Sequence, residues 1–270
     1  MKTVTCMSMS MKTLLISLLS FVAFVLQAQT AVNYKCDTAQ LAGFYALPEK
    51  SPAGVKGKPG VVVLHAWMGI TDHEKQTINK LAKLGYIALA ADVYGAKVKP
   101  TNYQEAGQLS GYYKKNYQVY QARIKAAIEQ LIKLGADPDK IVVIGFCFGG
   151  TGAIEAARAR LPIRGVVSFH GGLGRDTLRP IEPMFASLLI LHGADDPYVP
   201  ATEVAAFQKE MRSANANWQM TYYSKAVHAF TDPAAGNDPA RGAAYNKEAA
   251  ALSWKAFTIF LEHLMHPGEL

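Results

Sequence analysis

The stretch Lys140-Ile141-Val142-Val143-Ile144-Gly145-Phe146-Cys147-Phe148-Gly149-Gly150 joins an apolar strand to a helical segment rich in alanine. We interpret it as a nucleophile elbow with cysteine where serine usually stands. A nucleophile on such a turn adopts strained backbone geometry, and the chain passes close by on both sides, so small residues are needed two positions before and after it. Gly145 and Gly149 meet that need. The helix N-terminus that follows favours a thiolate, although a buried structural cysteine is the alternative.

The first thirty residues differ in composition from the rest of the chain. They contain two lysines, no acidic residue and an apolar run over 14–26, which a small and polar stretch follows. This pattern is typical of a secretory signal peptide cleaved near Ala28, and the run is too short for an easy membrane span. We therefore expect residues 1–28 to be removed, with Met1 or Met11 as the start, and the mature protein to be periplasmic without a stable membrane anchor.

The remaining residues, 29–270, are numerous enough to bury one large α/β domain. Loss of the two signal-peptide lysines lowers the formal net charge from +7 to +5, and the other cationic side chains are spread along the chain. A solvated surface explains them better than nucleic-acid binding. Oligomeric state is not predicted by any feature of the sequence.

Two cysteines remain after the expected cleavage, in a compartment that permits disulfides. We do not expect Cys36 and Cys147 to pair, because Cys36 lies on an N-terminal strand that we place along a distant edge.

Apolar strands alternate with helices along the chain. This order predicts a mostly parallel, twisted sheet with helices on both faces. Thr71 and Glu74 form a capping box at one helix start, and Gly85 follows the end of that helix. The region 96–118 carries several tyrosines without clean periodicity and is either a cap over a site or a surface helix. The expected strands are 31–36, 60–65, 86–91, 140–145, 165–170, 188–192 and 219–223, and the expected helices are 72–84, 121–134, 202–213 and 245–263.

Three groups of chemistry-bearing residues follow strand ends. They are the elbow at Cys147, the stretch 192–196 and the stretch 227–230. Ligands of such sheets bind beyond the carboxyl ends of the strands, so we expect these groups to converge on one rim.

The chain resembles the dienelactone hydrolase family of the α/β-hydrolase fold from about Val32 to Leu264. A cysteine elbow with an acid and a histidine downstream, in that order, makes the resemblance specific. The matching segments are Tyr34 with 43–48, His65-Ala66-Trp67-Met68-Gly69, Gly85-Tyr86 with Asp92-Val93-Tyr94-Gly95, the elbow, and Asp196-Pro197-Tyr198-Val199-Pro200 with His228-Ala229-Phe230.

The resemblance implies that Cys147 is the nucleophile, Asp196 the acid and His228 the base, in the chain order that this fold uses. In such a triad the thiolate attacks an acyl carbonyl, the imidazole transfers protons, and the carboxylate orients the imidazole. The spacing of Asp196 to Val199-Pro200 favours it over the rival acid Asp195.

Three other histidines compete for the role of base. His65, His170 and His192 are the last residues of expected strands, whereas His228 opens a loop after the last strand, where this fold places its base.

The resemblance also implies an oxyanion hole formed by the backbone N–H groups of Trp67 and Phe148. Tyr94 and His170 are candidates to line the substrate pocket.

Two positions depart from the family pattern. The best-known dienelactone hydrolases have a glutamate before the second oxyanion donor, where this chain has Ala66, so activation of the thiol falls to His228 and the helix N-terminus. They also use an arginine shortly after the catalytic histidine to hold a substrate carboxylate, where this chain has Thr231-Asp232. The sequence therefore does not favour an anionic dienelactone.

These features predict a hydrolase that cleaves a carboxylic ester, lactone or thioester through an acyl-cysteine intermediate. Neither a cofactor nor a metal is expected, because zinc-ligand spacings and a phosphate-cradling glycine loop are absent from the sequence. A small molecule is the only expected partner. The alternative, which Ala66 supports, is a non-catalytic or redox-sensing small-molecule-binding module on the same fold. A peptidase is a weaker third hypothesis.

Overall fold

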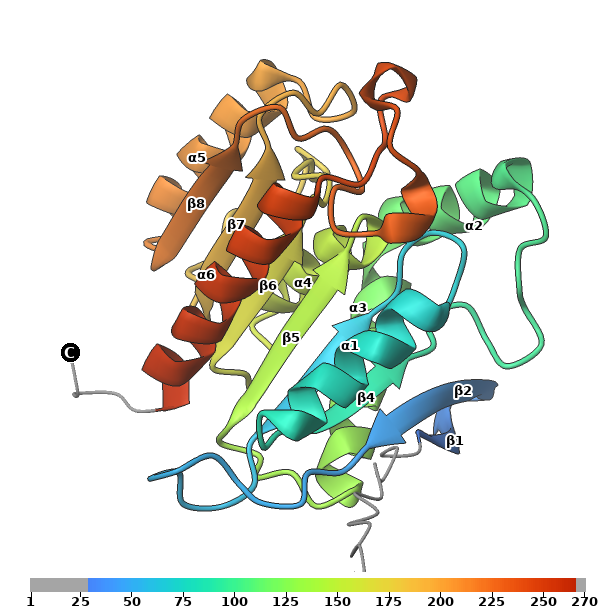
Figure 1. The fold of residues 1–270 in the computed structure, drawn as a ribbon, viewed down its shortest axis with the longest axis vertical. Helices are drawn as coiled ribbons and strands as arrows, with labels where there is room; N and C mark the ends of the chain where they lie inside the picture. The colour runs from blue at the N-terminus through green and yellow to red at the C-terminus, as the bar shows by residue number, and fades with distance from the viewer. Residues whose placement is uncertain (1–28, 266–270) are drawn as a thin grey trace, which may run out of the picture.

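The computed structural model describes residues 29–265, and its centre is one twisted eight-stranded sheet (Figure 1). Five of the strands are buried along almost their whole length, as expected for a sheet covered on both faces. The strands are β1 (Thr30–Cys36), β2 (Ala39–Ala46), β3 (Gly60–Leu64), β4 (Ile87–Ala91), β5 (Ile141–Phe146), β6 (Gly165–Phe169), β7 (Ser187–Gly193) and β8 (Trp218–Tyr223).

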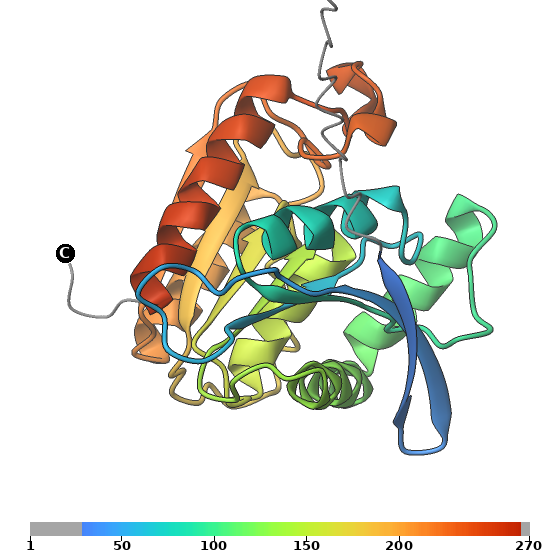
Figure 2. The same cartoon turned by 60° about the horizontal axis from the view of Figure 1, so that its bottom comes forward.

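The strands lie in the order β1-β2-β4-β3-β5-β6-β7-β8. All neighbours from β4 to β8 pair in parallel, whereas β1 and β2 form an antiparallel hairpin at one edge (Figure 2). The mostly parallel sheet confirms the predicted fold class. The sequence did not predict β2 as a strand, because half of its residues Ala39–Ala46 are alanine or glycine and its position depends on pairing with β1 and β4.

Helices cover both faces of the sheet (Figures 1 and 2). Side chains from α1 and α6 pack on one face, and side chains from α3, α4 and α5 pack on the other. The predicted capping box of Thr71 and Glu74 opens α1. The helices are α1 (Asp72–Lys83), α2 (Tyr103–Lys115), α3 (Tyr117–Lys133), α4 (Phe148–Arg158), α5 (Ala201–Ser213) and α6 (Lys247–Met265).

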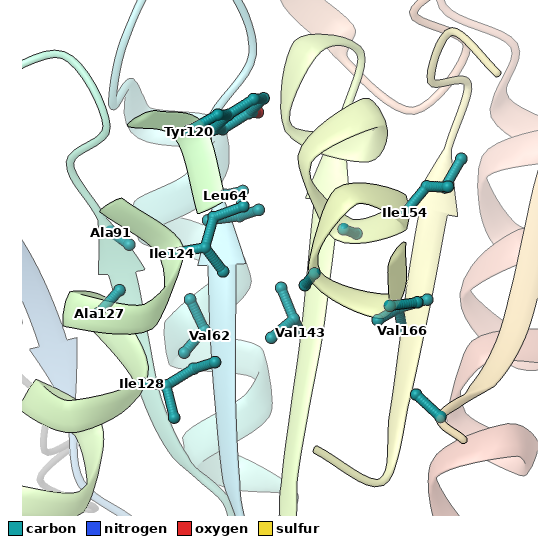
Figure 3. Packing of buried hydrophobic residues seen from close by; sticks show 14 of the residues in the cluster. Val62, Leu64, Ala91, Tyr120, Ile124, Ala127, Ile128, Val143, Ile154 and Val166 are labelled. Atoms are coloured by element: carbon teal, nitrogen blue, oxygen red, sulfur yellow. The ribbon is translucent and has the colours of Figure 1, made fainter. Parts of the chain in front are cut away.

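The core consists of two clusters, one on each face of the sheet. The larger cluster lies between the central strands and the helices α3 and α4 (Figure 3). Val62 and Leu64 of β3 contact the α3 side, and Val143 of β5 lies beside them. Each of these side chains is fully buried, which contributes about 1.5–3 kcal/mol apiece before the entropy cost. Alternate residues of the same strands, such as Val63 and Ile144, pack on the opposite face. This two-sided packing fixes the strand ends that carry the site.

The tyrosine-rich region contains a helix, α2, and the start of α3. Tyr113 is buried and its hydroxyl donates to the Tyr94 carbonyl at 3.1 Å. Tyr103 is exposed, and its ring stacks on Trp67 with the ring centroids 5.4 Å apart. The helix α3 begins at Tyr117, four residues before the expected start. Region 96–118 thus packs against the segment after β4 through Tyr113 and reaches the loop after β3 through Tyr103.

A buried ion network joins α4 to α5. The guanidinium of Arg158 donates to Glu155 at 2.9 Å and to Glu210 at 2.7 Å, and all three side chains are almost fully buried. Arg158 also donates to the carbonyls of Leu173 and Gly174. The network ties the helix behind the elbow to the loop after β6.

Cys36 lies on the edge strand β1 and Cys147 follows β5, with three strands between them. Both are free thiols, as expected. Within residues 29–265 no helix has the length and apolar character to cross a membrane, and no group of three or more acidic, histidine or cysteine side chains is arranged to hold a metal ion. The predicted signal peptide, 1–28, lies outside the described residues.

Candidate active site

The elbow has the strained geometry that the sequence predicted. Cys147 links β5 to α4 with φ 53° and ψ −113°, a left-handed conformation that is unfavourable for a residue with a side chain. A Cβ on Gly145 would collide with the backbone of Gly149, and a Cβ on Gly149 would collide with the backbone at Leu64. The two glycines therefore let the turn lie against β3.

The Cys147 thiol is held in an environment that favours its ionised form. Its pKa would be raised by burial, but the hydrogen bond to His228, the charges of His228 and Lys114, and the backbone N–H of Phe148 together lower it. The backbone N–H of Cys147 donates to the Phe169 carbonyl at 3.0 Å.

His228 and Asp196 are the other two members of the predicted triad. His228 Nδ1 lies 2.8 Å from Asp196 Oδ2, and the Asp196 side chain is fully buried. The second Asp196 oxygen accepts the N–H of Tyr198 at 2.9 Å. Burial lowers the pKa of His228, but the hydrogen bonds to Asp196 and Cys147 outweigh it and raise that pKa to about 10. A lowered thiol pKa beside a raised imidazole pKa favours a thiolate–imidazolium pair at neutral pH.

The rival acid and two of the rival bases occupy other positions. Asp195 is exposed. The buried His65 donates from Nδ1 to the Ala66 carbonyl at 2.6 Å and accepts the Val93 N–H at Nε2. His192 is buried against the ring of Tyr222. Burial lowers the pKa of both histidines.

The third rival, His170, contacts the backbone of Cys147. The N–H of Cys147 is shared between the Phe169 carbonyl, at 3.0 Å, and His170 Nδ1, at 3.2 Å. With Nδ1 as an acceptor, Nε2 carries the proton and donates to Thr231 Oγ1 at 2.8 Å. Burial lowers the pKa of His170 far below its ordinary value. The ring is 2% exposed, so it joins the elbow to the loop after His228 instead of presenting a free nitrogen to a ligand.

The two candidate oxyanion donors lie on separate elements. Trp67 lies in the loop between β3 and α1, and Phe148 is the first residue of α4. Within residues 29–265 the Trp67 N–H has no hydrogen-bond partner, and the Phe148 N–H is one of the groups that lower the pKa of the Cys147 thiol. Tyr94, a predicted pocket residue, is 4% exposed and donates its hydroxyl to the Trp67 carbonyl at 2.8 Å.

Several residues of the site had no functional signal in the sequence. Glu74 was found only as a helix cap, yet its buried carboxylate also accepts the Ala66 N–H at 3.1 Å and so braces the loop before Trp67. Lys114 is exposed on α2 and was interpreted as part of a solvated surface. Its effect on Cys147 depends on the packing of α2 over the rim, which spacing along the chain does not reveal.

Comparisons with known proteins identify similar sequences and similar structures. A model of the dienelactone hydrolase family matches residues 41–265. A dienelactone hydrolase-like promiscuous phosphotriesterase from metagenomic libraries has a similar structure, with a TM-score of 0.80 and 34% identity, over 88% of this chain and 98% of that one. A Bradyrhizobium protein described as a probable 2-oxo-3-(5-oxofuran-2-ylidene)propanoate lactonase is 29% identical over 75% of this chain and 83% of its own length. The fold is shared by a dienelactone hydrolase from Anabaena variabilis, at 18% identity and a TM-score of 0.60 over 87% and 97% of the two chains. The chain therefore belongs to the dienelactone hydrolase family and has the α/β-hydrolase fold.

Proposed function

We propose that this hydrolase cleaves a carboxylic ester, lactone or thioester through an acyl-cysteine intermediate on Cys147. The observation that carries the proposal is the His228–Asp196 hydrogen bond of 2.8 Å beside the thiol on the strained elbow, where His228 lowers the pKa of Cys147. This arrangement supplies a nucleophile, a base and a group that orients the base.

The reaction proceeds in two stages. The Cys147 thiolate attacks the acyl carbon, and the negative charge that develops on the carbonyl oxygen is taken up by the N–H groups of Trp67 and Phe148. The tetrahedral intermediate expels the alkoxide or thiolate leaving group, which receives a proton from the His228 imidazolium. His228 then removes a proton from water, the hydroxide attacks the thioester, and collapse returns the carboxylic acid, the Cys147 thiolate and the imidazolium.

Asp196 has a supporting role in the same scheme. Asp196 keeps the His228 proton on Nδ1 and stabilises the charged ring. Because the thiolate, the imidazole and the two backbone N–H donors suffice for acyl transfer, neither step requires a metal or an organic cofactor. In a lactone the leaving alkoxide stays attached to the acyl chain until water releases both together.

Phosphotriester hydrolysis is a second candidate activity. The observation that favours it is the 34% identity to a structure described as a promiscuous phosphotriesterase. A thiolate and two N–H donors suit a phosphoryl centre as they suit an acyl centre, since both develop charge on one oxygen. Water would convert the triester to a diester and an alcohol, with His228 again supplying and removing the proton.

The test is hydrolysis of p-nitrophenyl esters, simple lactones, acyl thioesters and a p-nitrophenyl phosphotriester by the mature protein, beside Cys147→Ala and Cys147→Ser. Loss of activity in the alanine variant supports a thiol hydrolase, and the relative rates rank the substrate classes. Activity no higher than that of Cys147→Ala on every substrate contradicts the proposal and favours a small-molecule-binding module.

We also propose that residues 1–28 direct export to the periplasm and are then removed. The apolar run over 14–26 and the small residues after it support this. Intact mass of the protein from a periplasmic extract of cells that express the full chain tests it, with an N-terminus near Gln29 expected. Full-length protein confined to the cytoplasm contradicts it.

A further inference from the structure

Two buried tyrosine hydroxyls donate to the carbonyls of the two candidate oxyanion donors, one to each. We propose that Tyr94 and Tyr120 are positioning residues that hold the backbones of Trp67 and Phe148 so that both N–H groups address the same substrate oxygen. The inference rests on the proposed function, because it assigns these tyrosines to the oxyanion hole of that reaction.

Tyr94 holds the loop between β3 and α1. Its hydroxyl donates to the Trp67 carbonyl at 2.8 Å. Its ring is fixed by an edge contact with His65, with centroids 4.7 Å apart, and by a tilted contact with Phe148 at 5.4 Å. Burial, and secondarily the nearby Cys147, raise the pKa of Tyr94 well above its ordinary value, so the hydroxyl remains a donor at any working pH.

Tyr120 holds the first residue of α4 in the same way. Its hydroxyl donates to the Phe148 carbonyl at 2.9 Å, and its ring stacks on the Phe148 ring at 4.6 Å with an angle of 6°. The side chain is fully buried, and burial raises its pKa. A Cβ on Gly152 would overlap the tyrosine hydroxyl, so that glycine makes room for the contact.

The two tyrosine hydrogen bonds matter for catalysis as well as for packing, because an oxyanion hole needs rigid donors. An oxyanion hole lowers the barrier because its donors are fixed before the charge appears, and a donor displaced by a fraction of an ångström loses much of that effect. Trp67 lies in a loop without regular hydrogen bonding, so its direction depends on its neighbours: Glu74 holds the preceding residue, Ala66, from one side and Tyr94 holds the Trp67 carbonyl from the other. Tyr113 links the pair, because its ring contacts those of Tyr94 and Tyr120.

The test compares Tyr94→Phe and Tyr120→Phe with Tyr34→Phe as a matched control. Each change removes one buried hydroxyl that donates to a carbonyl. Tyr34 lies on the edge strand β1, and its bond of 3.0 Å goes to the carbonyl of Asp92, which is not a candidate oxyanion donor. We expect kcat of the first two variants to fall about tenfold, below the 10²–10³-fold effect of deleting a donor outright, with KM changed less than about twofold. The control should keep kcat within about twofold of the wild type, on the same principle that only interactions specific to the transition state change kcat.

Two further readouts separate positioning from general damage. Iodoacetamide should alkylate Cys147 of Tyr94→Phe at the wild-type rate, because the thiolate does not depend on the Trp67 loop. Amide order parameters from ¹⁵N relaxation should fall at Trp67 in Tyr94→Phe and at Phe148 in Tyr120→Phe, with each effect confined to its own donor.

The outcomes distinguish this inference from the proposed function. If the wild type hydrolyses esters but both variants match Tyr34→Phe in kcat, the positioning role is refuted and the hydrolase stands. If the wild type hydrolyses nothing, the proposed function fails, and the inference fails with it as an account of an oxyanion hole. Unchanged order parameters at the Trp67 and Phe148 amides would contradict the inference whatever the activity.

Discussion

The substitution His228→Ala should change how Cys147 reacts with pH. In the wild type the pKa of the thiol is lowered against its burial chiefly by the hydrogen bond and charge of His228, while the pKa of His228 is raised to about 10. The thiolate–imidazolium pair therefore exists between the two pKa values. Removal of the ring leaves burial as the main influence, so the pKa of the thiol rises and the thiolate is lost at neutral and acidic pH.

The size of the effect follows from two opposing trends. At a pH below the thiol pKa of both the wild type and the variant, each unit by which the thiol pKa is lowered raises the thiolate fraction about tenfold. It also lowers the intrinsic reactivity of the thiolate about threefold, so the net gain in rate is about threefold. An opposite charge in hydrogen-bond contact typically shifts a pKa by about 1–3 units. We therefore expect iodoacetamide to react with Cys147 about 3- to 30-fold more slowly at pH 6 in His228→Ala.

The assay is the rate of carboxamidomethylation from pH 5 to 10, followed by mass spectrometry of the peptide that contains Cys147. Cys36 serves as the control in the same sample, since it lies three strands away and its rate should not respond to the substitution. The wild-type rate should be nearly constant between the pKa of the Cys147 thiol and that of the His228 ring, whereas the variant rate should increase with pH. Identical pH profiles for the two proteins would refute the thiolate–imidazolium pair.

Three further substitutions test other parts of the site. Asp196→Asn keeps the volume but favours the wrong His228 tautomer, so kcat should fall by about 10²–10⁴-fold while the circular dichroism spectrum stays the same; a wild-type kcat would exclude Asp196 as the orienting acid. Glu74→Gln turns an NH₂ group toward backbone donors and loosens the loop at Ala66, and steady-state kinetics should show kcat reduced about tenfold with KM little changed; a larger effect on KM would point to the pocket instead. Arg158→Met removes the most deeply buried cation of the network and leaves Glu155 with Arg179 and Glu210 with Arg175, so urea denaturation should show a loss of about 1–3 kcal/mol, and a loss under about 0.5 kcal/mol would mean that Arg175 and Arg179 neutralise the carboxylates without it.

The sequence predicted the features that local pattern or chain order determines. The apolar runs gave the parallel strands, Gly145 and Gly149 marked the close approach at the elbow, and Thr71 with Glu74 marked the start of α1. The order of Cys147 and the groups downstream of it, together with parallel strands that share one rim, predicted which side chains meet.

The contacts that hold the site together could not be predicted in the same way. The hydroxyl of Tyr120 meets the Phe148 carbonyl across 28 residues, and Thr231 meets His170 across 61. Neither pair has a spacing signal, because each contact depends on how a helix or loop packs over the rim. Tyr94 and His170 were predicted to line the substrate pocket, and their burial and satisfied hydrogen bonds emerged only from the tertiary structure.

The central claim is that hydrolysis passes through an acyl group on Cys147. The most direct measurement mixes the mature protein with excess p-nitrophenyl acetate, quenches the reaction in acid within the turnover time, and locates the acyl group by mass spectrometry of the digested protein. The account predicts an acetyl thioester on the peptide that contains Cys147, absent from Cys147→Ala and decaying as free acetate appears. Continued turnover with no acyl group on that peptide, or undiminished turnover by Cys147→Ala, would contradict it.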